Sequence, residues 1–293
     1  MNQTSKAMTM MIVAMLILPG IDAIAKWLST SISSGQVTWA RFFFQILLMF
    51  PLFLRSKGSW RTSVMILHAA RGGLLALATL LFFSGLKYLP IADAISIFFI
   101  EPLLVTLLSA VLLGESIGWR RLSAVAIGFA GALIIIRPGF ETFGWAVLLP
   151  VGTALCFSFY IILTRSLAQH EDPVRLQFFT GVFGCLVMSL ALVFGAFTEI
   201  PVLASVWPDT FQWGLLAGLG VIATVGHLLV VHAFRHAPVG VLAPFQYIEI
   251  VGATVLGLTI FNDFPDLTTW VGVSIIAASG IYVFRRESRL SRQ

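Results

Sequence analysis

Long apolar stretches alternate with short polar segments along the whole chain. Each apolar stretch holds about 20 residues, which is enough for a helix to cross the ~30 Å hydrocarbon core of a bilayer. The expected crossings are residues 8–29, 35–55, 63–86, 91–113, 119–136, 143–165, 174–198, 211–234, 239–261 and 267–284. The pattern predicts an all-α integral membrane protein with ten transmembrane helices and little length left for a soluble domain.

The second half of the sequence repeats polar landmarks of the first half. A shift of 148 positions relates three pairs, which are Glu101 and Glu249, Glu115 and Asp263, and Arg137 and Arg285. Each half would hold five crossings, and because five is odd, the second half must enter the membrane from the opposite side. We therefore expect two inverted five-helix repeats, residues 1–138 and 139–293, which can pack in two ways that open to opposite sides.

Composition and charge support a membrane location and argue against a nucleic-acid partner. Hydrophobic residues make up 58% of the chain and charged residues 11%, whereas soluble domains carry about 25% charged residues. The net charge of +5 arises from Lys and Arg in alternate loops, which is the pattern that sets membrane topology. It predicts that both termini are cytoplasmic.

The cysteines and the N-terminal segment add no further chemistry. Cys156 and Cys185 lie within apolar stretches and lack metal-ligand spacing, so we expect core thiols. Residues 8–18 could be the apolar region of a signal peptide with a cleavage site at residues 23–25. We expect them to form the first crossing instead, because their removal would leave nine helices. No motif predicts a metal or a cofactor.

Glu101 and Glu249 are the foremost candidates for a binding or gating role. Each is expected about ten residues into its crossing, ~15 Å deep, where a carboxylate costs several kcal/mol unless it is neutral, paired or in a wet cavity. Pro102 permits a kink beside Glu101, and Gln246 lies one turn before Glu249. The structural alternative is that these acids hold a kinked backbone together.

Two basic helix residues and one acid–base pair are further candidates. Asp22 and Lys26 are four residues apart, so they can pair or bind a zwitterion, and Pro19 before them can break the helix. Arg41 can bind a carboxylate or phosphate in bidentate fashion, and Arg71 lies in the third crossing. Snorkelling or pairing with an acid is the alternative for both arginines.

Other residues have weaker signals. His227 could couple transport to protons because it changes charge near pH 7, although a neighbour could simply satisfy it. Phe98 and Tyr247 could stack on a cationic or aromatic substrate. Asp93 is expected to cap its helix. Small residues at four-residue spacing predict close helix approach and are found at Ala124, Gly128 and Ala132 and at Gly214 and Gly218.

An ordered series of motifs resembles a known repeat. The series is Ala92-Asp93-Ala94-Ile95-Ser96, Glu101-Pro102, Leu113-Gly114-Glu115, Gly128 with Gly131, and Arg137. It resembles the EamA-type repeat of the drug/metabolite transporter superfamily, over nearly the whole chain and twice. The second copy departs from the pattern at Ile250, which replaces the Pro, and at Asn262-Asp263, which replaces Gly-Glu. The resemblance implies ten helices that move small organic metabolites.

A narrower resemblance concerns two segments. Arg41-Phe42-Phe43 and His68-Ala69-Ala70-Arg71-Gly72 are similar to a bacterial subgroup that includes S-adenosylmethionine and riboflavin carriers. The resemblance implies a multi-pass protein of the bacterial inner membrane.

We therefore expect a secondary transporter of a small polar or zwitterionic metabolite, such as an amino acid, working by alternating access. The family resemblance implies export rather than uptake. Protons are a possible coupling ion, and no obligate protein partner is expected. S-Adenosylmethionine, riboflavin and nucleotide-like molecules are alternative substrates. An intramembrane enzyme is a rival of another class, but the sequence has none of the hydrolase or phosphate-loop motifs that would support it. A channel or scaffold is a third possibility.

Overall fold

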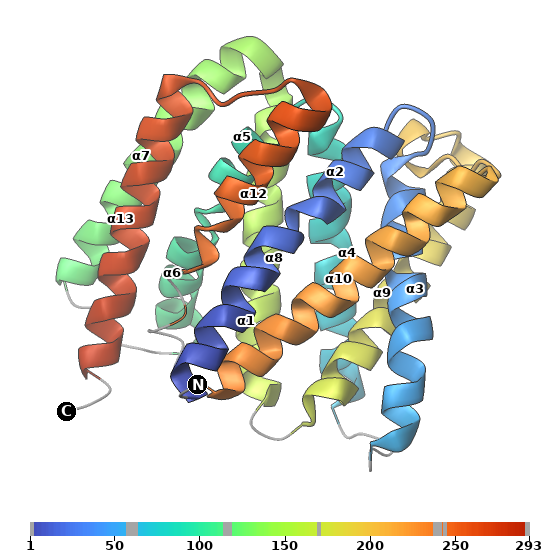
Figure 1. Ribbon diagram of the computed structural model, residues 1–293, viewed down its shortest axis with the longest axis horizontal. Helices are drawn as coiled ribbons and strands as arrows, with labels where there is room; N and C mark the ends of the chain where they lie inside the picture. The colour runs from blue at the N-terminus through green and yellow to red at the C-terminus, as the bar shows by residue number, and fades with distance from the viewer. Residues whose placement is uncertain are drawn as a thin grey trace.

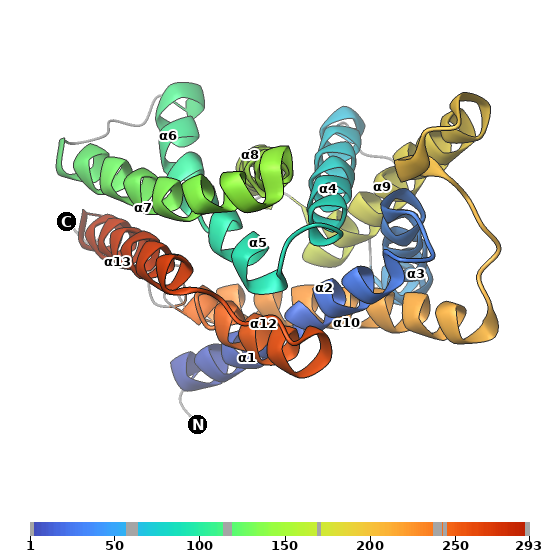
Figure 2. The ribbon, with the colours of Figure 1, turned by 90° about the horizontal axis from the view of Figure 1, so that it is seen from above.

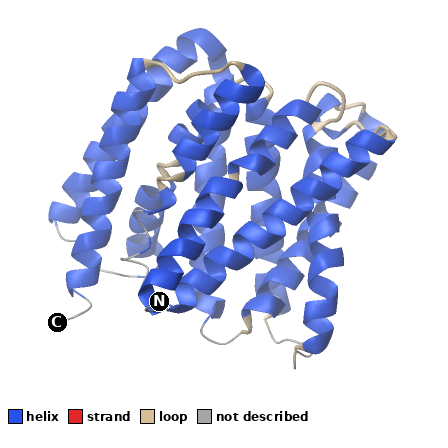
Figure 3. Cartoon of the chain, in the orientation of Figure 1, coloured by secondary structure: helices blue, strands red, loops and turns tan. Residues whose placement is uncertain are grey.

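The computed structural model describes residues 3–56, 64–113, 119–168, 171–236, 242 and 245–290, and the regular elements among them are all helical (Figure 3). The α-helices are α1 (Gln3–Ile17), α2 (Pro19–Leu28), α3 (Ser34–Arg55), α4 (Met65–Leu86), α5 (Ile91–Phe98), α6 (Glu101–Leu113), α7 (Trp119–Phe143), α8 (Leu148–Ala168), α9 (Pro173–Thr198), α10 (Thr210–His236), α12 (Glu249–Leu256) and α13 (Leu267–Leu290). Short 3₁₀ segments η1 (Gly144–Val147) and η2 (Pro201–Leu203) and the π-helical segment η3 (Gly257–Phe261) complete them.

The lengths and compositions of these helices define a multi-pass membrane protein. Seven spans are long and apolar enough to cross a bilayer. They are Ser5–Leu28, Ser34–Arg55, Met65–Leu86, Ile91–Leu108, Phe140–Thr164, Pro173–Thr198 and Thr210–Ala233. Three shorter apolar helices, Leu122–Ile136, Glu249–Phe261 and Leu267–Tyr282, fall where the remaining crossings are expected. The all-α membrane class is thus confirmed.

Three of the expected crossings contain a break in the helix. Leu18 separates α1 from α2, directly before Pro19, as the sequence indicates. Residues 91–113 form two helices, α5 and α6, and the break at residues 99 and 100 lies close to Pro102, where the sequence permits a kink. Residues 247 and 248 form a turn before α12. The breaks matter because non-helical backbone in a membrane persists only where protein or water satisfies it.

The helices pack as pairs that join distant parts of the sequence. α1 packs against α10, α3 and α4 against α9, α4 against α8, and α7 against α13. The pair α7 and α13 lies side by side at one flank in both views, and α2, α5 and α12 lie between this flank and α3 (Figures 1 and 2). The first turn of α1 and the last turn of α13 lie at the same end of the bundle (Figure 1).

Small residues explain one close helix contact and fail to explain another. A Cβ on Gly131 of α7 would lie 3.0 Å from the carbonyl oxygen of Gly272 in α13, and Ser279 of α13 donates a hydrogen bond to the Ala124 carbonyl oxygen. The expected close approach is therefore present at α7. Nothing lies within 4 Å of a Cβ built on Gly214 or Gly218, so the same prediction is wrong for α10.

Several polar landmarks of the expected repeat fall outside the part of the chain that the structure describes. Glu115 lies outside the described residues, as do the side chains of Arg137 and Arg285. Cys156 and Cys185 are free thiols, half-buried rather than fully in the core.

Candidate functional site

The two central breaks have the same hydrogen-bond geometry. Before Glu101, the Ile100 amide donates to the Ile97 carbonyl oxygen at 3.2 Å, and the Leu103 amide donates to that of Ile100 at 3.0 Å. Before Glu249, the Ile248 amide donates to the Phe245 carbonyl oxygen at 3.1 Å, and the Val251 amide donates to that of Ile248 at 2.9 Å. Every member of the second set lies 148 positions after its counterpart. The sequence shift therefore describes a repeated local structure.

Both glutamates begin a helix at these breaks. Glu101 is the first residue of α6 and Glu249 the first residue of α12. The free amides at a helix N-terminus carry a partial positive charge that favours a nearby carboxylate. Pro102, without an amide hydrogen, suits the first turn of α6. In α12 that position is Ile250, so the break forms without proline. The expectation that Gln246 and Glu249 share one face of a continuous helix is wrong, because Gln246 lies before the turn at residues 247 and 248.

Four charged or titratable side chains from four helices form a central cluster. Asp22 of α2 interacts electrostatically with Glu249 of α12 and with Arg41 of α3, and Arg41 in turn with His227 of α10. α2 packs against both α10 and α12, and α3 packs against α10. Asp22 and Arg41 are buried and Glu249 and His227 are half-buried. These four residues are called the central cluster below.

Arg41 is held in place rather than snorkelling to an interface. It is 7% exposed, and its Nη1 donates a hydrogen bond to the hydroxyl of Thr79 in α4. Its guanidinium carbon lies 5.3 Å from the centre of the Phe42 ring. The buried Nε atom has no hydrogen-bond partner among the described residues. A fixed guanidinium with a donor to spare suits recognition of an anionic group.

A hydrogen bond within α10 fixes the tautomer of uncharged His227. Its Nδ1 lies 2.8 Å from the Ala223 carbonyl oxygen one turn earlier. A carbonyl oxygen only accepts hydrogen bonds, so Nδ1 carries the hydrogen and the uncharged ring keeps its lone pair on Nε2. The lone pair is able to accept a proton or a hydrogen bond from a ligand.

Lys26 does not pair with Asp22, so that interpretation is wrong. Its Nζ lies 2.6 Å from Oδ2 of Asp263 and donates a second hydrogen bond, 3.0 Å long, to the Leu89 carbonyl oxygen. The ammonium also lies 5.0 Å from the centre of the Phe261 ring. Asp263 follows η3 and lies 237 residues after Lys26 in the sequence, so the pair joins distant parts of the chain. In the sequence, the repeat shift singled out Asp263 but gave no sign of its partner.

Arg71 anchors the opposite end of the bundle. It is 1% exposed and donates hydrogen bonds to the Thr164 hydroxyl at 3.0 Å, the Leu176 carbonyl oxygen at 3.4 Å and the Tyr160 hydroxyl at 3.5 Å. Its neighbour His68 has Nε2 3.8 Å from a carboxylate oxygen of Glu171, which also pairs with Arg175 at 3.2 Å. This set ties α4 to α8 and α9, and its Tyr160 side chain also interacts electrostatically with Arg41 of the central cluster.

Aromatic side chains connect the two breaks and line the region between them. Phe99, in the turn before Glu101, contacts Tyr247, in the turn before Glu249, with ring centres 5.1 Å apart. Tyr247 also interacts electrostatically with Glu101. Phe98 packs edge-on against Phe82 and Phe157, with centre distances of 6.0 and 5.5 Å. Phe98 and Tyr247 therefore belong to the surroundings of the breaks.

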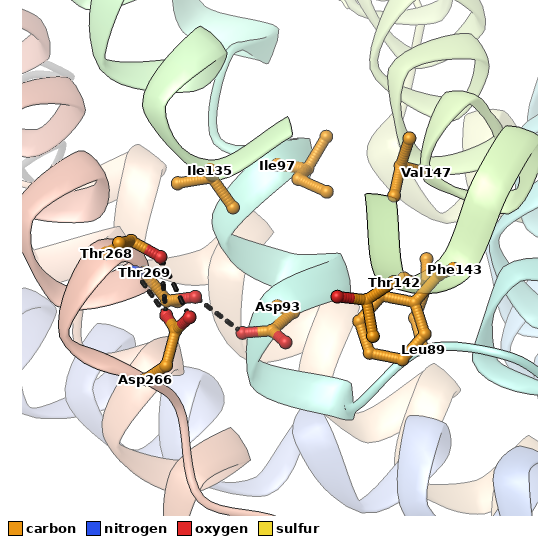
Figure 4. A pocket seen from close by; sticks show the side chains of 10 residues that line it. All are labelled: Leu89, Asp93, Ile97, Ile135, Thr142, Phe143, Val147, Asp266, Thr268 and Thr269. Atoms are coloured by element: carbon orange, nitrogen blue, oxygen red, sulfur yellow. Dashed lines mark hydrogen bonds between the residues drawn. The ribbon is translucent and has the colours of Figure 1, made fainter. Parts of the chain in front are cut away.

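A small cavity of about 50 Å³ lies near Lys26 rather than at the central cluster; its lining includes Leu89, whose carbonyl oxygen accepts a hydrogen bond from Lys26. This end of the bundle is called the Lys26 end below. The cavity lining also includes Asp93, Asp266 and Thr269, which face one another (Figure 4). The Thr269 hydroxyl of α13 donates a 2.8 Å hydrogen bond to Asp93 of α5. No side chain caps the N-terminus of α5, so the expectation that Asp93 is a cap is wrong. Its partner is on another helix.

The Asp266 carboxylate is organised by its own helix. It accepts hydrogen bonds from the Thr269 amide at 2.7 Å and the Thr268 hydroxyl at 2.8 Å. Partial burial acts to raise the pKa of Asp266, but these hydrogen bonds outweigh it and hold the pKa below its usual value.

A bundle of apolar helices broken beside buried acids is the architecture of membrane carriers, in which discontinuous helices place charged groups and free backbone at mid-membrane. The sequence matches the profile of the EamA-like transporter family over residues 5–137 and again over residues 144–285. The chain belongs to that family, part of the drug/metabolite transporter superfamily, and the resemblance drawn from its motifs is confirmed.

Two groups of similar proteins are named as transporters of different compounds. An S-adenosylmethionine uptake transporter of Rickettsia bellii is 28% identical over 92% of this chain and 89% of the relative. A riboflavin transporter of Rhizobium johnstonii is 28% identical over 100% of this chain and 98% of the relative. A crystal structure covering 96% of this chain and 98% of the other superposes with a TM-score of 0.65 at 21% identity, which supports the fold.

Proposed function

We propose that the protein is a secondary carrier that moves a small organic metabolite with a cationic or zwitterionic group by alternating access. The observation that carries the proposal is the central cluster, in which the buried Asp22 interacts electrostatically with a second carboxylate and a guanidinium from two other helices, beside a broken helix. With both carboxyls ionised and His227 uncharged, one negative charge is uncompensated. Within a bilayer such a charge is costly, so a proton or a cationic ligand is expected to neutralise it.

The proposed architecture has ten crossings in two inverted repeats, residues 1–138 and 139–293. Seven long spans and three shorter apolar helices support the number ten. The family profile matches the two halves separately, and the duplicated turns at Glu101 and Glu249 support a repeat. In such an arrangement, exchange of the conformations of the two halves moves the opening from one side to the other.

The charge of the central cluster ranks the candidate substrates. S-Adenosylmethionine carries a sulfonium, an ammonium and a carboxylate, so its net positive charge would match the uncompensated charge, while Arg41 would receive the carboxylate. Amino acids and related compounds share the ammonium and carboxylate. Riboflavin is flat and uncharged, and the aromatic group of Phe82, Phe98 and Phe157 supports it as the second candidate.

The proposed location is the bacterial inner membrane, with both termini in the cytoplasm. The distribution of Lys and Arg between alternate loops supports this topology, and the relatives named above are bacterial. Protons are the proposed coupling ion, because a proton on Asp22 or Glu249 would replace the charge of a departing cation. We propose no enzymatic role; the buried acids act in binding and in charge compensation.

Ligand-dependent thermal stabilisation of the purified protein tests the proposal. A panel of cationic, zwitterionic and flat neutral metabolites would be screened, since a ligand at 100 times its Kd adds ~2.7 kcal/mol. Hits would be tested for counterflow in proteoliposomes. We expect Asp22→Asn and Glu249→Gln to abolish counterflow of a cationic hit. Glu199→Gln, which changes an exposed carboxylate at the end of α9, is the matched control.

Two results would contradict the carrier. Flux that neither saturates nor shows trans-stimulation would identify a channel. Counterflow that survives both central substitutions would remove the cluster from the binding site.

A further inference from the structure

Two polar contacts at the Lys26 end join the two sequence halves. Lys26 of α2 pairs with Asp263, which follows η3, and Asp93 of α5 accepts a hydrogen bond from Thr269 of α13. In each contact one partner lies within residues 5–137 and the other within residues 144–285, the two ranges that match the family profile. If the halves move apart at this end, both contacts must break.

We propose that Lys26 and Asp263 form a latch that closes this end of the carrier and that Lys26 passes to Asp93 when the latch opens. The inference rests on the proposed function, since it assigns a conformational role within the same transport cycle. Lys26 is therefore a gating residue and does not bind the substrate.

Alternative partners for the open state are already in place. Asp93 interacts electrostatically with Lys26, and both belong to the first half. The Thr269 hydroxyl donates to Asp93, and the Thr269 amide donates to Asp266 at 2.7 Å. Asp266 and Thr269 both belong to the second half. After separation, each half therefore retains an acceptor for the donor that has lost its partner.

The solvent exposure of the pair favours reversible opening. The side chains of Lys26 and Asp263 are 16% and 31% exposed, so water can solvate both charges when they separate. An ion pair that is partly hydrated costs less to break than one that would leave a buried charge unpaired. Arg71, at the opposite end, is 1% exposed and is bonded to three groups, so it is the more static anchor in this structure.

Accessibility of a buried cysteine reports the latch without any substrate. Ile97 lines the cavity at the Lys26 end, one turn deeper than Asp93 in the same helix, and is 1% exposed. Ile97→Cys would be placed in a protein whose Cys156 and Cys185 are replaced by Ala. A membrane-impermeant thiol reagent would then be applied to each side of proteoliposomes in turn.

The two acids are expected to act in opposite directions on the labelling rate. Asp263→Asn removes the partner of the closed state, so labelling from the Lys26 side should rise about tenfold, equal to about 1.4 kcal/mol. Asp93→Asn keeps an amide oxygen that can accept the Thr269 hydrogen bond of the closed state but removes the charge that Lys26 pairs with in the open state, so labelling should fall. Glu199→Gln, which changes an exposed carboxylate at the end of α9, is the matched control and should leave the rate unchanged.

Cross-linking provides a second and independent readout. In the same background, Lys26→Cys with Asp263→Cys, joined by a short bifunctional thiol reagent that forms reducible bonds, should lose both counterflow and labelling from the Lys26 side, and reduction should restore both. Equal labelling in the Asp263→Asn and Asp93→Asn proteins, or counterflow that continues in the cross-linked protein, would overturn the latch. Ligand binding that depends on Glu249 would then still support the central site. Labelling as expected in a protein that binds no metabolite would support the latch and contradict the proposed function.

Discussion

Phe99 and Tyr247 occupy equivalent positions in the two halves, 148 residues apart, and their rings contact each other at 5.1 Å. Residues related by a two-fold axis touch only where they lie close to that axis. The contact therefore marks the place through which the proposed pseudo-two-fold axis passes, and the duplicated turns before Glu101 and Glu249 lie on either side of it. Lys26 and Asp263 are not equivalent positions, so an exchange of conformations between the halves is expected to change their separation.

A link at the axis is expected to leave transport intact. When two halves exchange conformations, equivalent residues at the axis keep their separation, because each takes the place of the other. Phe99→Cys with Tyr247→Cys, joined by a short bifunctional thiol reagent, should retain counterflow. The Lys26–Asp263 cross-link is the comparison. Loss of transport in both proteins would show that the halves do not move about this point.

The two glutamates are expected to contribute unequally to ligand binding. Glu249 interacts with the central cluster, whereas Glu101 interacts with Tyr247. Glu249→Gln should weaken binding of a cationic ligand by about 1.5–3 kcal/mol, the contribution of a hydrogen bond to a charged group, which is about 10- to 150-fold in Kd. Glu101→Gln should change Kd less. Isothermal titration of both variants measures the difference, and equal losses would contradict it.

Arg71 is expected to contribute to stability more than to binding. Replacement by Ala removes three hydrogen bonds and leaves a buried cavity, so unfolding in detergent should become easier by about 2–5 kcal/mol, as for other large-to-small core substitutions. Thr164→Val removes one of the three bonds and should cost about 0.5–1.5 kcal/mol. Thermal unfolding followed by fluorescence compares the two. A normal melting temperature for Arg71→Ala would be inconsistent with an anchor.

The lowered pKa of Asp266 predicts that the stability of the first turn of α13 depends on pH. The folded pKa of Asp266 lies below the unfolded value, so the stabilisation that Asp266 provides is present above the unfolded value of about 3.9 and is lost as the pH falls through the folded pKa. Hydrogen exchange of the first turn of α13 should therefore accelerate with falling pH below about 4, beyond its intrinsic rate. In Asp266→Asn this additional pH dependence should disappear.

Glycine substitutions distinguish a packed helix face from an open one. Gly131→Ala places a methyl group 3.0 Å from the Gly272 carbonyl oxygen, so α7 and α13 must separate, at a cost of about 1–3 kcal/mol. Gly214→Ala meets nothing within 4 Å and should stabilise α10 by about 0.5–1 kcal/mol through the lower flexibility of alanine. Relative to the unmodified protein, the melting temperature should fall for Gly131→Ala and rise for Gly214→Ala.

The crossings were predictable because apolar length alone specifies them in a membrane protein. The break before Pro19 was also signalled, since proline removes a backbone donor. The break before Glu249 has no proline at the position equivalent to Pro102, which is Ile250, so the sequence did not signal it in the same way. Likewise, helical spacing placed Lys26 next to Asp22, but local spacing carries no information about a carboxylate that folds back from residue 263. Contacts between the halves were the part that the sequence left open.

One departure in the second copy has a simple conformational explanation. Asn262 replaces the glycine found at position 114, and in the structure it adopts a left-handed conformation with φ of 58° and ψ of 27°. Glycine and asparagine are the residues that adopt it most readily, so the departure preserves the backbone preference.

The left-handed residue sets the direction in which the chain leaves η3. Directly after it, the Asp263 amide donates to the Gly257 carbonyl oxygen at 3.0 Å, and the carboxylate reaches the ammonium group of α2. Both the handedness and the number of residues between Phe261 and Asp263 determine this reach. A one-residue insertion or deletion there would turn the Asp263 carboxylate away from Lys26, although every charged residue would remain in the sequence. The spacing of this segment therefore matters as much as the identity of its residues.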